Sequence, residues 1–116
     1  MKYFTLDEFN CPSLPNSGKN MDTNFLTKLE EARELAGIPF KITSGYRTKE
    51  HNKEVGGVPN SSHLIGVAAD IAVSSGSERY TILNALIKAG FRRIGVAKTF
   101  IHCDTDDSKQ NSVWTY

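Results

Sequence analysis

Three residues in this sequence combine metal-binding side chains with apolar surroundings. Asp70 lies within Val67–Val73, where all the other residues are apolar, and His63 stands seven residues before it. His102 lies in a second, mainly apolar segment, Phe100–Asp104. A buried carboxylate must be paired with another group or bound to a metal, because an isolated charge is unfavourable to bury. Two histidines and one carboxylate form a three-ligand set for a catalytic zinc ion, which leaves the fourth position for water.

The residues alone admit other roles for this set. A histidine near an aspartate is commonly a hydrogen-bonded structural pair, and Asp70 could cap a strand or form a salt bridge with Arg47. The spacing also differs from the helical zinc motif, in which two histidines stand four residues apart with an adjacent glutamate. A zinc site and a metal-free structural pair are therefore both open at this point.

Hydrophobic periodicity predicts the helices that must support these residues. Apolar residues recur every three or four positions in Thr23–Ala36 and in Glu78–Ala89, and Gly37 and Gly90 end the two segments. Shorter helical segments and turn-rich loops are predicted between the longer elements. The short helices are Thr5–Phe9 and Thr48–Val55, and the loops are Asn10–Asn20 and Gly56–Ser62.

The strands are predicted from short apolar or alternating segments bounded by turn residues. Ala68–Val73 is apolar apart from Asp70, which indicates a buried strand, whereas Phe40–Ser44 alternates between apolar and polar residues. Three further strands are predicted near the C-terminus, at Arg93–Val96, Thr99–Asp104 and Val113–Tyr116. This mixture predicts a small α+β domain, in which helices pack on a mainly antiparallel sheet.

The predicted strand Thr99–Asp104 also assigns side chains to faces. Because side chains alternate along a strand, His102 and Asp104 face one side and Cys103 faces the other. Cys103 is therefore predicted to be a buried core residue rather than a ligand. The sequence contains only two cysteines, too few for a disulfide scaffold, and their spacing leaves open whether they pair.

Length and charge narrow the class of protein. The 116 residues fit one domain, residues 1–116, and 39% hydrophobic and 23% charged residues are ordinary for a globular protein. A formal net charge of +1 gives no electrostatic reason for a nucleic-acid partner. No apolar run reaches the roughly 20 residues of a membrane span, and Asp7 and Glu8 stand where a signal peptide would be apolar. We therefore expect a monomer without a membrane partner, synthesised in the cytoplasm.

Three separated motifs resemble one known family. Ser61–Asp70 reads Ser-Ser-His-Leu-Ile-Gly-Val-Ala-Ala-Asp, which fits the pattern S-x-H-x-x-G-x-A-x-D at every specified position. Ile42–Arg47 stands upstream of it and Phe100–Asp104 downstream. Over residues 3–105, the chain resembles the zinc D-alanyl-D-alanine carboxypeptidase and L-alanyl-D-glutamate endopeptidase family. That family includes several phage lysins and shares its fold with hedgehog signalling domains.

The resemblance implies a zinc peptidase. His63, Asp70 and His102 match the family's three ligands of one zinc ion. Water bound to such a zinc ion titrates near neutral pH, so that hydroxide can attack an amide carbonyl. The implied reaction is hydrolysis of peptidoglycan stem peptides, of the D-Ala-D-Ala carboxypeptidase or the L-Ala-D-Glu endopeptidase type. The implied place of action is the bacterial cell wall, reached after lysis or as part of a phage particle.

The resemblance also implies two substrate-binding residues. Arg47 matches the arginine that binds the carboxylate of the substrate, a role that suits the planar guanidinium group. The alternative for Arg47 is a surface ion pair with Glu50 or Glu54. Ser61 matches a serine beside the first zinc ligand and could contact the peptide, and its alternative is a loop cap.

The sequence departs from the family at the general base. Many relatives carry Glu or Asp three residues before the third zinc ligand, where this chain has Thr99. Asp104 is the nearest acidic candidate for a catalytic role on the face of His102, and its alternative role is to orient that histidine. This departure leaves a second function open, that of a non-catalytic, zinc-stabilised module that binds the cell wall or a peptide.

Three other residues that attract notice receive simpler interpretations. His51 lies in a polar stretch and is expected to be solvated. Trp114 and Tyr116 could line a groove, but the docking of a terminal strand on the core is the simpler interpretation.

Overall fold

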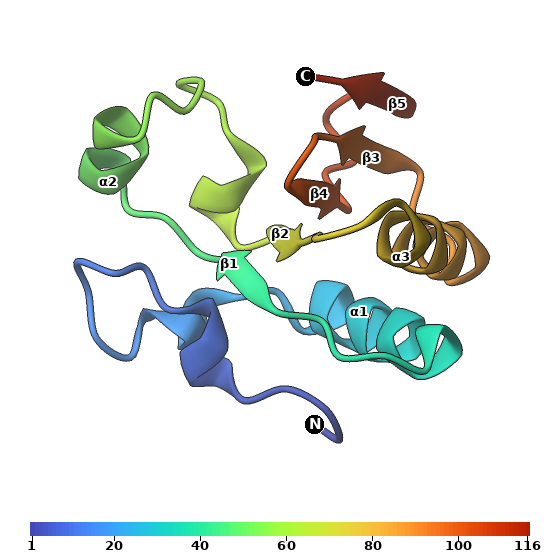
Figure 1. Cartoon of the computed structure of the whole chain (residues 1–116). Helices are drawn as coiled ribbons and strands as arrows, with labels where there is room; N and C mark the ends of the chain where they lie inside the picture. The colour runs from blue at the N-terminus through green and yellow to red at the C-terminus, as the bar shows by residue number, and fades with distance from the viewer.

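Five short strands form a single sheet in the computed structural model, which describes residues 1–116. The strands are β1 (Ile42–Ser44), β2 (Ala68–Ala72), β3 (Arg93–Val96), β4 (Phe100–Asp104) and β5 (Ser112–Thr115). Their order across the sheet is β1-β2-β4-β3-β5, and all neighbours are antiparallel except β3 and β5. Figure 1 views this sheet nearly along its strands. The predicted α+β fold with a mainly antiparallel sheet is confirmed.

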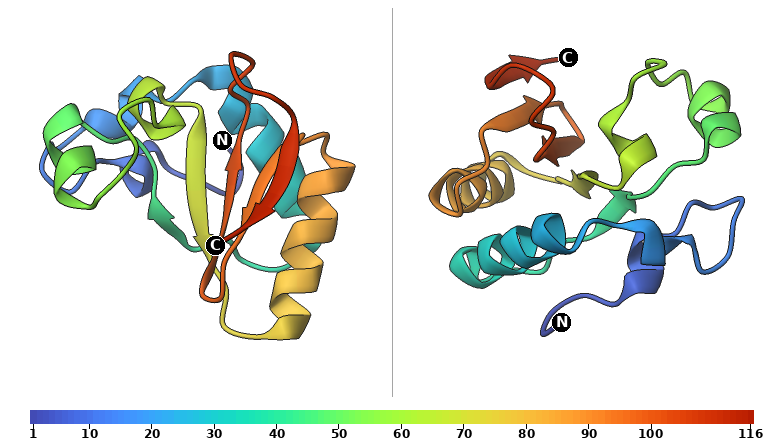
Figure 2. Two further views of the ribbon diagram at one scale, coloured as in Figure 1. Left: turned by 90° about the horizontal axis from the view of Figure 1, so that it is seen from above. Right: turned by 180° about the vertical axis from the view of Figure 1, so that it is seen from behind.

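The two long helices cover one face of this sheet. The helices are α1 (Thr23–Ala36), α2 (Lys49–Glu54) and α3 (Gly76–Lys88), with the 3₁₀ helices η1 (Leu6–Phe9), η2 (Ser17–Asn20) and η3 (Ser62–Ile65). α1 and α3 lie side by side on one side of the sheet, and α2 and η3 lie on the other (Figure 1 and Figure 2). None of the helices combines the length and the apolar composition that crossing a membrane requires.

Side-chain alternation divides the strands between the core and the opposite face. Ile71, Ile101 and Cys103 are fully buried in the hydrophobic core. Asp70 and His102 alternate with these residues and therefore point to the other face. Cys103 lies in the core as predicted, where burial raises the pKa of its thiol well above the usual value. Both cysteines of the chain are free and buried.

Side-chain hydrogen bonds at the N-terminal caps determine where α1 and α3 begin. Oδ2 of Asp22 accepts a hydrogen bond from the backbone nitrogen of Phe25 at 2.9 Å, so α1 begins where the sequence predicts. α3 begins at Gly76, two residues before the predicted start, because the hydroxyl of Ser75 caps it. That hydroxyl accepts a hydrogen bond from the backbone nitrogen of Glu78 at 3.1 Å.

Two 3₁₀ helices lie where the sequence predicts loops or turns. In the predicted loop Asn10–Asn20, side chains fold the backbone into η2, because Ser17 Oγ accepts from the nitrogen of Cys11 at 2.7 Å. η3 occupies the turn that ends at Gly66 (φ 73°), a left-handed conformation that favours glycine. A side chain at Gly66 would clash with the carbonyl oxygen of Asn20. The glycine therefore returns the chain from η3 to β2.

Candidate metal centre

Three side chains from separate segments meet on the sheet face opposite α1 and α3. Asp70 on β2 and His102 on β4 are paired directly in the sheet, and His63 lies on η3. Nδ1 of His102 is 3.0 Å from Oδ1 of Asp70, and Nε2 of His63 is 3.4 Å from the same oxygen. The three ligand atoms all lie within 4.8 Å of one another. The structure thus brings together the three residues that the sequence predicts as metal ligands.

Hydrogen bonds on the far side of each imidazole ring determine which nitrogen faces Asp70. Nδ1 of His63 donates to the carbonyl oxygen of Gly45 at 2.7 Å. Nε2 of His102 donates to Oδ2 of Asp104 at 2.7 Å. A carbonyl oxygen and an ionised carboxylate only accept hydrogen bonds, so both of these nitrogens carry hydrogen. In the neutral histidines, the nitrogens that face Asp70 therefore carry no hydrogen and present a lone pair, as a metal-binding nitrogen must.

The donor set fits a zinc ion. Two nitrogen lone pairs and one carboxylate oxygen converge, and only a cation or added protons can lie stably between such acceptors. Tetrahedral zinc with bonds of about 2.0–2.1 Å places neighbouring ligand atoms about 3.3 Å apart. Asp70 lies 3.0 Å from the ligand nitrogen of His102 and 3.4 Å from that of His63. Three protein ligands leave one position for water or substrate, the pattern of catalytic zinc sites.

Electrostatics within the site keep Asp70 ionised. Burial alone would raise the pKa of Asp70, but hydrogen bonds from the protonated forms of His102 and His63, and the positive charge of those rings, hold it well below its usual value. Burial also opposes the charged form of His102, but hydrogen bonds with Asp104 and Asp70 raise its pKa above the usual value. A proton on His102 therefore competes with a metal for Nδ1, and metal binding must release it.

Arg47 lies beside the metal ligands rather than on the open surface. Its side chain is only 15% exposed. Nε donates to Oγ of Ser44 at 3.0 Å, Nη1 donates to Oδ1 of Asn52 at 3.2 Å, and Nη2 lies 3.6 Å from Oδ2 of Asp70. The alternative of an ion pair with the glutamates of α2 is wrong. Each terminal nitrogen carries a second N–H, so the guanidinium keeps donors for a ligand carboxylate.

Asn52, which is not among the residues predicted from the sequence, supports Arg47. The residue is only 4% exposed although it lies in the polar helix α2. Its Oδ1 accepts from Arg47, and its Nδ2 donates to the carbonyl oxygen of Val58 at 2.9 Å. A side chain at Gly57 would clash with the Asn52 amide. The glycine pair after α2 is the only sequence signal for this arrangement.

A chain of hydrogen bonds holds the turn that carries His63. Ser61 caps η3, because its Oγ accepts from the backbone nitrogen of His63 at 3.3 Å. The loop-cap alternative for Ser61 is therefore correct, and Ser61 also lines the cavity described below. Ser62 Oγ donates to Oδ2 of Asp106 at 2.7 Å, and Nζ of Lys109 donates to Ser62 Oγ at 2.9 Å. Ser62, Asp106 and Lys109 are not among the site residues predicted from the sequence.

Asp104 is a buried partner of His102. Its side chain is 1% exposed and accepts from Nε2 of His102 at 2.7 Å, Nε of Arg93 at 2.8 Å and the nitrogen of Asp106 at 3.1 Å. Burial opposes the ionisation of Asp104, but the hydrogen bonds from His102 and Asp106 and the charge of Arg93 lower its pKa. This is the geometry of a carboxylate that orients a metal-ligating histidine. The catalytic role assigned to Asp104 stays a prediction.

A cavity of about 360 Å³ opens over the three ligands. One wall is the segment Val55–Val58 after α2, and another is formed by Trp114 of β5 and by Tyr116, which follows β5. Asp70 and Asp104 are the only acidic side chains that line it. The interpretation of the terminal strand as core docking is therefore incomplete, because β5 pairs with β3 while Trp114 and the following Tyr116 also line the cavity.

Two features lie outside this site. The expectation that His51 is solvated is wrong, because its side chain is only 19% exposed and Nδ1 lies 3.9 Å from Oε2 of Glu54.

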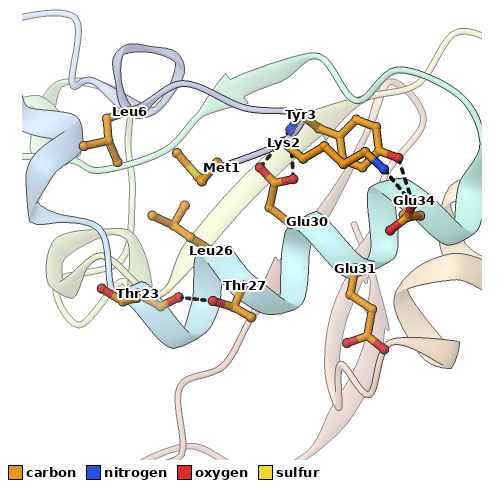
Figure 3. Close-up of a pocket in the computed structure, with 10 residues that line it drawn as sticks. All are labelled: Met1, Lys2, Tyr3, Leu6, Thr23, Leu26, Thr27, Glu30, Glu31 and Glu34. Carbon is orange, nitrogen blue, oxygen red and sulfur yellow. Dashed lines mark hydrogen bonds and ion pairs between the residues drawn. The ribbon is translucent and has the colours of Figure 1, made fainter.

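A second hollow, of about 670 Å³, lies between the N-terminal segment and α1 (Figure 3). Its polar groups bind one another: Glu30 accepts from the nitrogen of Tyr3 at 2.9 Å. No histidine or cysteine lines the hollow, so it offers no comparable ligand set.

The fold and the site together define an α+β protein with a candidate three-residue metal site on the open face of its sheet. The model of the family Peptidase M15 matches residues 2–104. The chain therefore belongs to the Peptidase M15 family, as the resemblance of its motifs predicts. The matched residues include the three predicted ligands and Arg47, and they end before β5. No curated protein matches the chain closely enough to count as a relative.

Proposed function

We propose that this protein is a zinc peptidase that hydrolyses an amide bond in the stem peptides of peptidoglycan. The observation that carries the proposal is the convergence of His63, Asp70 and His102 within 4.8 Å in a Peptidase M15 chain. When bound there, zinc supplies Lewis-acid activation of a water molecule and of the amide carbonyl. The proposal covers D-Ala-D-Ala carboxypeptidase and L-Ala-D-Glu endopeptidase activity at the bacterial cell wall, after lysis or from a phage particle.

Arg47 binds the carboxylate of the substrate in this proposal. Both candidate bonds have a carboxylate on the amine side, from the terminal D-Ala in one case and from D-Glu in the other. The guanidinium of Arg47 lies 3.6 Å from Asp70, so a carboxylate bound to it stands next to the metal ligands. A two-point contact of this kind orients the scissile amide and restricts its motion.

In this proposal, Ser61 contacts the substrate and Asp104 positions His102. Ser61 accepts a hydrogen bond from His63 through Oγ, so its hydroxyl hydrogen is free to donate to a peptide carbonyl. Asp104 holds the Nε2–H of His102 and thereby keeps Nδ1 directed toward Asp70. Asp104 acts in this scheme as a positioning residue, since three donors already surround its carboxylate.

The direct test is release of peptides from purified peptidoglycan by the zinc-loaded protein. Mass spectrometry of the new termini identifies the bond that is cut. We expect His63→Ala to abolish release and His51→Ala, which changes a histidine outside the cavity, to retain it. Cleavage that survives complete removal of the metal would refute the proposal.

A second candidate function is a zinc-stabilised binding module without turnover. The specific observation in its favour is the set of carboxylates in the cavity, where Asp70 is a ligand and Asp104 is already hydrogen-bonded. Thr99, which replaces the family's usual acid, is exposed and does not line the cavity. Calorimetric binding of a stem pentapeptide to the zinc-loaded protein, with no product after prolonged incubation, would favour the module over the enzyme.

A further inference from the structure

A lateral row of residues crosses all five strands on the face that carries the metal ligands. The sheet register pairs Ser44 with Asp70, Asp70 with His102, His102 with Gly95, and Gly95 with Trp114. Directly paired residues project from the same face of a sheet. Trp114, the single tryptophan of the chain, therefore belongs to the same face as two of the metal ligands.

Gly95 provides the space that lets Trp114 reach the site. A Cβ atom at Gly95 would lie 2.5 Å from Nε1 and 2.6 Å from Cε2 of Trp114, so the indole ring occupies the place of the missing side chain. The ring extends over Gly95 to His102, with 5.4 Å between the ring centroids and 47° between the planes. Any larger residue at position 95 would push the indole away from the cavity.

Arg93, which lies on β3 together with Gly95, contacts the indole ring of Trp114. Its guanidinium lies 4.9 Å from the Trp114 ring centroid, within the range of a cation–π contact. Nε of Arg93 donates to Asp104 at 2.8 Å, and Nη1 donates to the carbonyl oxygen of Gln110 in the connection to β5. The carboxylate that orients His102 and the aromatic ring beside it are thus positioned by one arginine.

The two ends of the row differ in chemistry. Arg47, which is bonded to Ser44, provides a cation at the β1 end of the cavity. At the β5 end the cavity is lined by the aromatic side chains of Trp114 and Tyr116. The metal ligands lie between these ends. A peptide whose carboxylate contacts Arg47 therefore extends toward Trp114 on the other side of its scissile carbonyl.

We propose that Trp114, positioned by Gly95 and Arg93, binds the substrate residue on the acyl side of the scissile bond and selects for a small apolar side chain there. The inference rests on the proposed peptidase function and adds a specificity determinant to it. Both candidate bonds, D-Ala–D-Ala and L-Ala–D-Glu, place an alanine at this position. The aromatic wall lies outside residues 2–104, so the family match does not account for it.

Fluorescence of the single tryptophan tests the contact directly. Zinc-loaded protein is mixed in a stopped-flow instrument with a stem pentapeptide, and Trp114 emission is recorded before turnover. We expect a saturable change in emission. In steady state, Trp114→Ala should raise KM about tenfold or more with zinc content unchanged, because the apolar contact is lost. Trp114→Phe should stay within about threefold of wild type, and Val113→Ala, at an exposed neighbouring position, should have no effect.

The outcomes separate this inference from the function on which it rests. The wild type could cleave the peptide while Trp114 emission is unchanged at saturation and Trp114→Ala keeps the wild-type KM. That result would refute the contact between Trp114 and the substrate, and the proposed peptidase function would remain supported. If the zinc-loaded wild type neither binds nor cleaves stem peptides, the proposed function is refuted, and the proposed role of Trp114 in substrate binding is refuted with it. If Trp114→Ala does not fold, the emission change of the wild type decides, and its absence at a saturating concentration of a cleaved peptide refutes the contact.

Discussion

Asp70 and His102 are directly opposed across the β2–β4 pair, and Nδ1 of His102 lies 3.0 Å from Oδ1 of Asp70. Two of the three ligand positions are therefore set by backbone register rather than by a mobile loop. His63 joins them from η3, where its Nδ1 is held by the carbonyl oxygen of Gly45. A ligand set built on paired strands is preorganised, because folding of the sheet fixes the positions of its side chains before a metal binds.

Loss of one ligand should remove the metal. We expect His63→Ala to lower bound zinc from about one ion per chain to less than about a tenth, since two ligands hold zinc poorly. The measurement is metal analysis after dialysis against a weak chelator. His51→Ala is the matched control and should retain full zinc. Full zinc content in His63→Ala would contradict the assigned ligand set.

The role of Asp104 can be decided by separating metal affinity from turnover. If Asp104 orients His102, Asp104→Ala should weaken zinc binding by about 10- to 100-fold, the usual effect of removing such a partner. Zinc affinity is measured by competition with a chromophoric chelator. An unchanged affinity together with a large fall in kcat would instead identify Asp104 as the general base. The three hydrogen bonds that the carboxylate accepts favour the first outcome.

Arg47 should contribute to substrate affinity through a carboxylate. Arg47→Lys keeps the charge but loses the planar, two-point contact, so we expect KM to rise about tenfold or more. The effect should disappear when the carboxylate of the substrate is converted to an amide. Arg79→Lys, at a half-buried arginine of α3 that lies outside the cavity and donates to the carbonyl of Lys98, serves as the control. An equal effect of Arg47→Lys on both substrates would argue against carboxylate recognition.

The support of η3 by Asp106 should make stability depend on pH. Burial opposes ionisation, but hydrogen bonds from Ser108 and Ser62 lower the pKa of Asp106 from 3.8 to about 2. Because the folded pKa lies below the unfolded one, ionised Asp106 stabilises the fold above about pH 4, and this contribution is lost as the pH falls toward 2. We expect Asp106→Asn to reduce the free energy of unfolding by about 1–3 kcal/mol at pH 7.

Denaturant unfolding across a pH series checks this expectation. The difference in free energy of unfolding between wild type and Asp106→Asn should shrink between about pH 4 and pH 2. Asp107→Asn changes an exposed neighbour and should have little effect at any pH. A difference that stays constant from pH 7 to pH 2 would show that the charge of Asp106 is not what stabilises η3.

Local patterns in the sequence predict much of the fold. The 3.6-residue periodicity of Thr23–Ala36 and its cap determine α1 to the residue, because both act within one helix. Alternation along Thr99–Asp104 correctly separates Cys103, in the core, from His102 and Asp104 on the other face. The same reasoning missed η2 and η3, since hydrogen bonds from particular side chains create these short turns.

The sequence by itself determined which residues carry the chemistry, because side-chain type and strand alternation are local properties. Only the tertiary structure decided their partners. Asp70 and His102 are 32 residues apart and meet through the pairing of β2 with β4. Asn52 reaches Arg47 through the packing of α2, and Trp114 reaches the cavity because β5 pairs in parallel with β3. Such contacts depend on strand order and packing across the whole domain, and no short segment of the chain encodes them.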